Sequence, residues 1–128
     1  MDATPEPPRV LVIGLDPYRV PGPWDPEPVA EAIQRATARF AEQGVSVENC
    51  LIGLDGSDDI EAVVTTALTA RSWDCVLVGG GIRRNEDRLK LFELIVNLVH
   101  RHAPGAAIAF NRALDDVVEA VERRLGPS

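Results

Sequence analysis

Four nearly continuous aliphatic runs recur along the chain, and a segment with helical periodicity separates each run from the next. The runs span residues 9–16, 45–54, 74–80 and 106–111. Continuous rather than alternating hydrophobicity is typical of strands that helices cover on both faces. Strands that alternate with helices favour a parallel sheet with right-handed crossovers. We therefore predict a three-layer α/β/α sandwich, flavodoxin-like or Rossmann-like, with four parallel strands in the order 2-1-3-4.

The intervening segments predict four helices. The first follows Asp25 and stops at Gly44, and the second begins near residues 57–59 with Ser57 or Asp58 as its N-cap. The third spans about 85–102 and ends before a Pro-Gly pair. The last spans about 113–125, with one face formed by Leu114, Val117, Val118 and Val121.

Composition limits the organisation and the partners of the protein. The 128 residues suffice for one core, and we expect a flexible tail at 1–8 followed by a single domain at 9–126. The net charge of −7 argues against nucleic acid or an anionic membrane as partner. No apolar run approaches the ~20 residues of a membrane span, and no secretory signal is visible. The expected location is therefore cytoplasmic.

The two cysteines and the standard binding motifs give no sign of a metal or a cofactor. Cys50 and Cys75 lie on strands that the predicted order places about 10 Å apart. That separation is too large for a disulfide, so we expect two buried thiols. No Cys/His spacing indicates a metal site. GxGxxG and GxxxxGK[ST] are both absent, so the cofactor, if there is one, stays unknown.

A long, proline-rich connection follows the first predicted strand. Residues 15–28 hold five prolines together with Asp16, Tyr18, Arg19 and Trp24. Connections after a strand usually take about two to six residues, and proline lowers the entropy that a fixed loop loses. Ligands of open parallel sheets bind at the carboxyl edge where the winding reverses, here between the first and third strands. The loop is predicted to form a wall of such a site, or else a covering flap with Trp24 packed on the sheet edge or on a second subunit.

The connection after the third strand is rich in glycine and arginine. Gly79, Gly80 and Gly81 would let the backbone approach an anion, and Arg83 would supply charge. The alternative is a tight turn with positive φ angles and solvated arginines. Asn111 ends the fourth strand at the same edge. The residues predicted to bind a small anionic ligand are Asp16, Tyr18, Arg19, Trp24, Gly79, Gly80, Gly81, Arg83 and Asn111.

The third predicted helix carries more apolar surface than one face of a sheet can cover. Its apolar residues between 89 and 99 spread over about 220° of the helix circumference. A homodimer through residues 85–102 would cover the surplus. Neighbouring helices or the proline-rich loop would be the alternative cover.

The stretches VIGLDP, DCVLVGGGIR, LFELIVNLVH and APGAAIAFN resemble a group of short, stand-alone bacterial α/β proteins without an assigned activity. The order of elements also resembles the receiver domains of two-component response regulators. Receivers carry a phosphoacceptor Asp at the end of the third strand, where this chain has Gly79 and Gly80. The resemblance therefore implies the fold but not phosphoryl transfer.

These features favour a non-enzymatic binding or regulatory module that holds a small anionic ligand or a partner at the carboxyl edge of the sheet. One alternative is a small hydrolase or lyase, with Asp16 as its acid–base group and Asn111 or Arg83 stabilising negative charge. A second alternative is an interaction protein that acts through the helix at 85–102.

Overall fold

The structure is a computed structural model in which residues 6–126 are described. The predicted tail at 1–8 thus lies mostly outside the described residues. The backbone carbonyl of Pro8 accepts a hydrogen bond from Ser46 N at 2.9 Å. The elements, in chain order, are β1 (Arg9–Leu15), the 3-10 helix η1 (Pro17–Arg19), α1 (Glu27–Glu42), β2 (Ser46–Ile52), α2 (Ile60–Thr69), β3 (Cys75–Val78), α3 (Gly80–Arg83), the 3-10 helix η2 (Glu86–Arg88), α4 (Leu89–His102), β4 (Ala107–Phe110) and α5 (Val117–Leu125).

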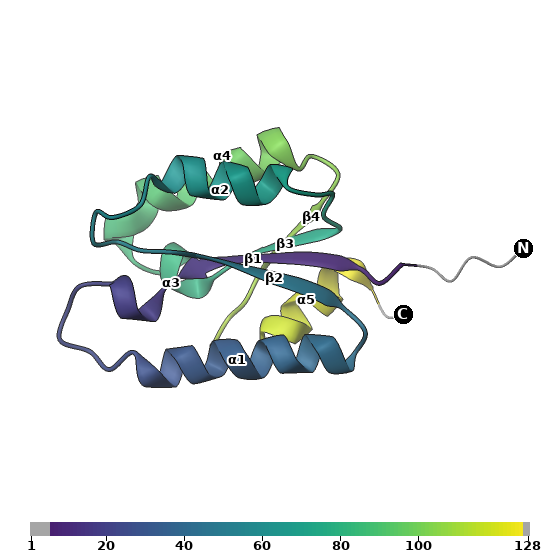
Figure 1. Cartoon of the computed structure of the whole chain (residues 1–128), viewed down its shortest axis with the longest axis horizontal. Helices are drawn as coiled ribbons and strands as arrows, with labels where there is room; N and C mark the ends of the chain where they lie inside the picture. Colours follow the sequence, from purple (N-terminus) through teal and green to yellow (C-terminus); the bar gives the residue numbers. More distant parts are fainter. Residues whose placement is uncertain (1–5, 127–128) are drawn as a thin grey trace, which may run out of the picture.

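The four strands form one parallel sheet in the order β2-β1-β3-β4. Helices α2 and α4 cover one face of this sheet, and α1 and α5 cover the other (Figure 1). The predicted three-layer fold and strand order are therefore confirmed. The winding reverses between β1 and β3, so their carboxyl ends mark the expected place for a ligand.

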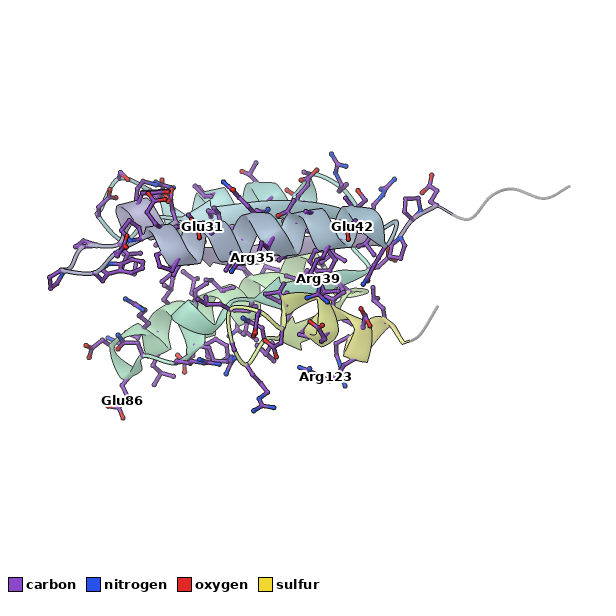
Figure 2. The ribbon with its side chains drawn as sticks, turned by 90° about the horizontal axis from the view of Figure 1, so that it is seen from below. Glu31, Arg35, Arg39, Glu42, Glu86 and Arg123 are labelled. Carbon is purple, nitrogen blue, oxygen red and sulfur yellow. The ribbon has the colours of Figure 1, made fainter. Side chains whose placement is uncertain are left out.

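Side chains that alternate along each strand fill two cores. The core under α2 and α4 includes Leu11, Ile13, Val76 and Val78, and the core under α1 and α5 includes Val10, Cys75 and Leu77. Helices α1 and α5 lie side by side in Figure 2, where an ion pair of 2.7 Å joins Arg39 to Glu119.

The N-terminus of α2 differs from the prediction. Its N-cap is Asp59, whose carboxylate accepts from Ala62 N at 3.2 Å, and neither Ser57 nor Asp58 takes that position. Asp58 instead accepts from Gly53 N at 2.8 Å. A backbone amide of the preceding loop thus competes for the carboxylate, which local propensity cannot reveal.

The helix predicted at 113–125 is shorter than expected. It begins at Val117, because the Asp116 carboxylate accepts from the backbone amides of Arg112 and Ala113 at 2.9 Å and holds residues 112–116 as a turn. Leu114 lies in that turn and is 51% exposed, so the prediction that it shares a helix face with Val117, Val118 and Val121 is wrong.

The segment 79–102 also differs from the prediction of one turn followed by one helix. It forms the short helix α3, then η2, then α4. The alternative of a tight turn with positive φ at Gly79–Gly81 is wrong, because the glycines with positive φ among the described residues are Gly22, Gly44, Gly56 and Gly126. Asn85 is the N-cap of η2, since its side chain accepts from Asp87 N at 2.9 Å.

Two further predictions agree with the structure. Gly44 ends α1 with a φ of +74°, the left-handed conformation expected of a glycine after a helix. Cys50 and Cys75 are buried free thiols.

Between residues 6 and 126 there is no helix with the length and apolar character needed to cross a membrane.

Helix α4 packs on α2 and on β3. Leu91, Phe92 and Leu94 are partly buried against the core, and Leu89, 59% exposed, is the large apolar side chain of α4 that faces solvent in the described chain. The neighbouring helix thus covers part of the surplus surface. Dimerisation through residues 85–102 stays a prediction.

Candidate functional site

An apolar pocket of about 370 Å³ lies at the carboxyl edge of the sheet, on the face that α1 covers. This volume is at the low end of the ~300–1,000 Å³ that small-molecule sites occupy. The sheet, the loop after β1, helix α1 and the β4–α5 turn all contribute to its wall. The apolar lining residues include Val12, Leu15, Pro17, Val20, Pro21, Trp24, Val29, Ala32, Ile33, Leu51, Leu77, Leu114 and Val117.

Small residues on the two central strands make room for this pocket. Gly14 of β1 and Gly79 after β3 both line it. A Cβ added at Gly14 would meet only Leu51 Cδ2, at 3.8 Å, which is an ordinary contact. The strand therefore does not need glycine here for backbone geometry, and a glycine inside a strand weakens it. The missing side chain leaves open space over the centre of the sheet.

The proline-rich loop forms one wall of the pocket. Pro17 is buried, and Trp24, 39% exposed, lines the pocket while its indole nitrogen donates to Val20 O at 3.0 Å. Gly22 has a φ of +143°, and a Cβ there would come within 3.3 Å of Trp24 Cδ1. Glycine at 22 thus lets the chain turn so that the indole lies against the pocket. The interpretation of the loop as a wall agrees with this geometry.

Asn111 is the buried polar residue of the pocket wall. It is 6% exposed, and its side-chain nitrogen donates to Ala113 O at 2.7 Å. This hydrogen bond fixes the orientation of the amide, so the other atom is an acceptor. No group in residues 6–126 donates to that Oδ1. A buried acceptor without a donor destabilises the fold, so a ligand that donates there would be bound favourably.

Arg83 lies behind Asn111 rather than in the pocket. Its guanidinium donates to the backbone oxygen of Asn111 and stacks over the ring of Phe110, 5.7 Å from the ring centroid. The Phe110 ring belongs to the core under α2 and α4. Arg83 therefore holds the end of β4 in place and is not one of the residues that line the pocket.

A more open, polar compartment of about 600 Å³ adjoins the apolar pocket. Arg84 and Arg88 line it, together with Asn85, Glu86 and Asp87. Arg88 donates to Gly81 O at 2.8 Å. The two compartments share the lining residues Gly80, Gly81, Arg88, Asn111 and Leu114.

Asp16 and Arg19 form a separate cluster beside the β2–α2 loop. The carboxylate of Asp16 accepts from Tyr18 N at 3.0 Å and from Arg19 Nε at 2.9 Å. Arg19 also pairs with Asp58 at 2.9 Å, and these two carboxylates raise the pKa of the guanidinium. The backbone amide of Gly53 and then Arg19 hold the pKa of Asp58 below its usual value. Each ionic group of this cluster has a partner of opposite charge, with one guanidinium shared by two carboxylates.

The structure therefore divides the predicted site residues into two groups. Trp24, Gly79, Gly80, Gly81 and Asn111 line the apolar pocket. The others lie elsewhere: Asp16 and Arg19 pair with each other, Arg83 supports Asn111, and Tyr18 is 61% exposed and donates to Glu27 at 3.1 Å.

Sequence reasoning missed Gly14, Arg88 and Leu114 as lining residues. An isolated glycine within an otherwise aliphatic strand is a signal for close backbone approach or open space, and it could have identified Gly14. Arg88 and Leu114 carry no comparable signal. Among the described residues, no three His, Cys, Asp or Glu side chains are grouped so that they could hold a metal ion.

Comparison with protein-family models gives no match, and comparison with curated proteins gives none either.

Proposed function

We propose that this protein is a binding module for a small ligand that inserts an apolar body into the pocket over β1 and β3. The observation that carries this proposal is the combination of open space above Gly14 with the unpaired, buried oxygen of Asn111 in one pocket wall. Open apolar space favours a hydrocarbon body, and the acceptor favours a ligand with an N–H or O–H group. The fold places this pocket where open parallel sheets bind ligands.

The alternative of a hydrolase or lyase receives less support from the geometry. A general base needs a free position within reach of a substrate proton. Both oxygens of Asp16 already accept hydrogen bonds, and Asp16 does not line the pocket. Its contacts are those of a residue that fixes the start of the proline-rich loop. A non-catalytic binding or regulatory role in the cytoplasm accounts better for the pocket.

The test uses 3-phenylpropan-1-ol, which combines an apolar body with an O–H donor. Trp24 lines the pocket, whereas Trp73 is 6% exposed in the opposite core and donates to Ala67 O. Titration should therefore change the fluorescence of Trp24 and leave that of Trp73 constant. For a ligand with ten non-hydrogen atoms, we expect a Kd on the order of a millimolar. Absence of any change in wild-type protein up to the solubility limit would contradict the proposal.

A matched pair of substitutions locates the binding. Gly14→Val adds a side chain where the Cβ has room, so it should project into the pocket over β1 and abolish binding while the protein stays folded. Gly105→Val introduces the same side chain in an exposed turn, with no atom within 4 Å of the added Cβ, and should bind like wild type. Equal binding by the two variants would place the alcohol elsewhere and contradict the proposal.

A further inference from the structure

Because they share lining residues, the apolar pocket and the polar compartment adjoin and give the site two chemically different ends. The apolar end lies between α1 and the sheet, and the polar end lies over α3 and η2. Arg88 and Asn111 belong to the lining of both ends. A molecule that fills the whole site therefore needs a hydrocarbon end, a polar end, and a hydrogen-bond donor near the junction.

The polar end carries two arginines whose charges are not neutralised by the protein. No ion pair within 4.0 Å joins Arg84 or Arg88 to a carboxylate among residues 6–126. The Nε of Arg84 lies so close over Gly80 that a Cβ there would be 3.3 Å away. Gly80 lines both compartments, so this guanidinium lies where they meet.

Two carboxylates also line the polar end. Figure 2 shows the side chain of Glu86 pointing away from the body of the protein. Arg84 and Arg88 thus bring two guanidinium groups to a compartment that Asn111 also lines. This arrangement suits a ligand that presents an anion and, next to it, a hydrogen-bond donor.

From this arrangement, and on the basis of the function proposed above, we infer that the ligand is an α-amino or α-hydroxy acid with an apolar side chain. Its carboxylate binds Arg84 and Arg88, and its α-substituent donates to Asn111 Oδ1. Its hydrocarbon side chain occupies the pocket over Gly14. The net charge of −7 gives anions no general attraction to the protein, so recognition depends on these two arginines.

The test compares ligands that share one phenyl body and differ at the polar end. The series is 3-phenylpropan-1-ol, 3-phenylpropanoate, 3-phenyllactate and phenylalanine, each titrated against the fluorescence of Trp24. We expect the propanoate to bind about tenfold more tightly than the alcohol, because its carboxylate pairs with arginine. The α-substituted acids should gain about a further fivefold through the donor to Asn111, and the better of the two identifies the substituent.

Three variants assign the gains to residues. Arg84→Gln combined with Arg88→Gln should remove the preference for the acid and leave binding of the alcohol. Arg112→Gln removes an exposed arginine near the same edge that lines neither compartment, so it should keep the preference. Asn111→Leu should make phenyllactate and phenylalanine bind no better than the propanoate.

The outcomes separate this inference from the proposed function. If the alcohol binds wild-type protein but not Gly14→Val, and the acids bind no better than the alcohol, the inference is overturned and the proposed function stands. If the acid preference survives in the double arginine variant, the anion is bound elsewhere and the inference is overturned as well. If no member of the series binds, both fail.

Discussion

The side-chain oxygen of Asn111 is buried beside the apolar pocket, and no group in the described chain donates to it. Replacement of Asn111 by Leu keeps nearly the same shape and removes both polar atoms of the amide. One methyl group then replaces the nitrogen that donates to Ala113 O, and the other replaces the unpaired oxygen. We expect the variant to be more stable than wild type and to bind the α-substituted acids more weakly.

The magnitude follows from two opposing contributions. A buried acceptor without a partner destabilises a fold by about 1–3 kcal/mol, and the substitution removes this penalty. The lost hydrogen bond to Ala113 O is worth about 0.5–1.5 kcal/mol. Ala113 is exposed, so water can replace that donor. The difference predicts a free energy of unfolding that is about 1 kcal/mol higher, or a Tm about 4 °C higher for a domain of this size.

Urea denaturation of wild type and Asn111→Leu, without ligand, measures this difference directly. The slope of the free energy of unfolding against urea concentration should be equal in the two proteins. A shift in the midpoint of the transition then measures a shift in stability. Asn97→Leu is the matched control, because Asn97 also donates its side-chain nitrogen to a backbone oxygen, at 2.8 Å, but is exposed on α4. Asn97→Leu should change the free energy of unfolding by no more than about 0.5 kcal/mol.

A decrease of 1 kcal/mol or more in the stability of Asn111→Leu would refute the reasoning. It would mean that the oxygen is well hydrogen-bonded in the ligand-free protein, and that the amide is a structural element of the β4–α5 turn. A stability equal to wild type, combined with unchanged ligand binding, would remove Asn111 from the site.

Three further predictions concern parts of the protein outside the pocket. A Cβ at Gly53 would lie 3.0 Å from Arg19 Cβ and 2.9 Å from Arg19 Nη1. Thermal unfolding should therefore show that Gly53→Ala lowers the free energy of unfolding by about 1–2 kcal/mol. The same substitution should lower it by less in an Arg19→Ala background. The pKa of Asp58 lies below its usual value in the folded protein. Ionised Asp58 therefore stabilises the fold above its unfolded-state pKa, and this stabilisation is lost as the pH falls through its folded-state pKa. The free energy of unfolding, measured from pH 5 to pH 2, should fall less steeply in Asp58→Asn than in wild type. Burial raises the pKa of the Cys75 thiol to about 11. At pH 8 a thiol reagent should therefore label Cys75 only as fast as the protein opens. Rapid labelling under native conditions would contradict the burial of this thiol.

The sheet and its order could be predicted because the relevant information is local and repeated. Four continuous aliphatic runs at regular intervals are compatible with few folds, and the rules of handedness leave few strand orders, of which the flavodoxin-like order is 2-1-3-4. The same rules predicted the edge at which the pocket lies. Asn111 was predicted at this edge because it ends the fourth predicted strand, and Trp24 because it lies in the proline-rich connection after the first.

The roles of the charged residues could not be predicted in the same way. Arg19 and Asp58 are far apart in sequence, and their ion pair of 2.9 Å depends on how the loops after β1 and β2 meet. The sequence alone does not show which of Arg19, Arg83 and Arg84 is free to bind an anion. Only the packing shows that Arg19 is already paired and that Arg83 supports the backbone of Asn111.

The glycine run after β3 illustrates a second limit. Consecutive glycines fit a tight turn with positive φ as well as a helical turn, because glycine has no strong preference between them. Packing decides the outcome here: a Cβ at Gly79 would lie 3.4 Å from Ile13 O, and one at Gly81 would lie 3.3 Å from Leu15 Cδ1. The glycines allow α3 to lie close against the end of β1.

Three features of the chain disfavour stability when each is considered alone, and all three meet at one pocket. A glycine at position 14 weakens a central strand, an unpaired amide oxygen is buried at Asn111, and the connection at 15–28 is longer than a strand-to-helix turn requires. Departures of this kind tend to cluster at functional sites, because selection for binding offsets their effect on folding. The prolines fit this account, since a rigid loop loses little entropy when a ligand fills the pocket beneath it. Each feature has its own physical origin, so their coincidence supports a binding role more strongly than the pocket volume does.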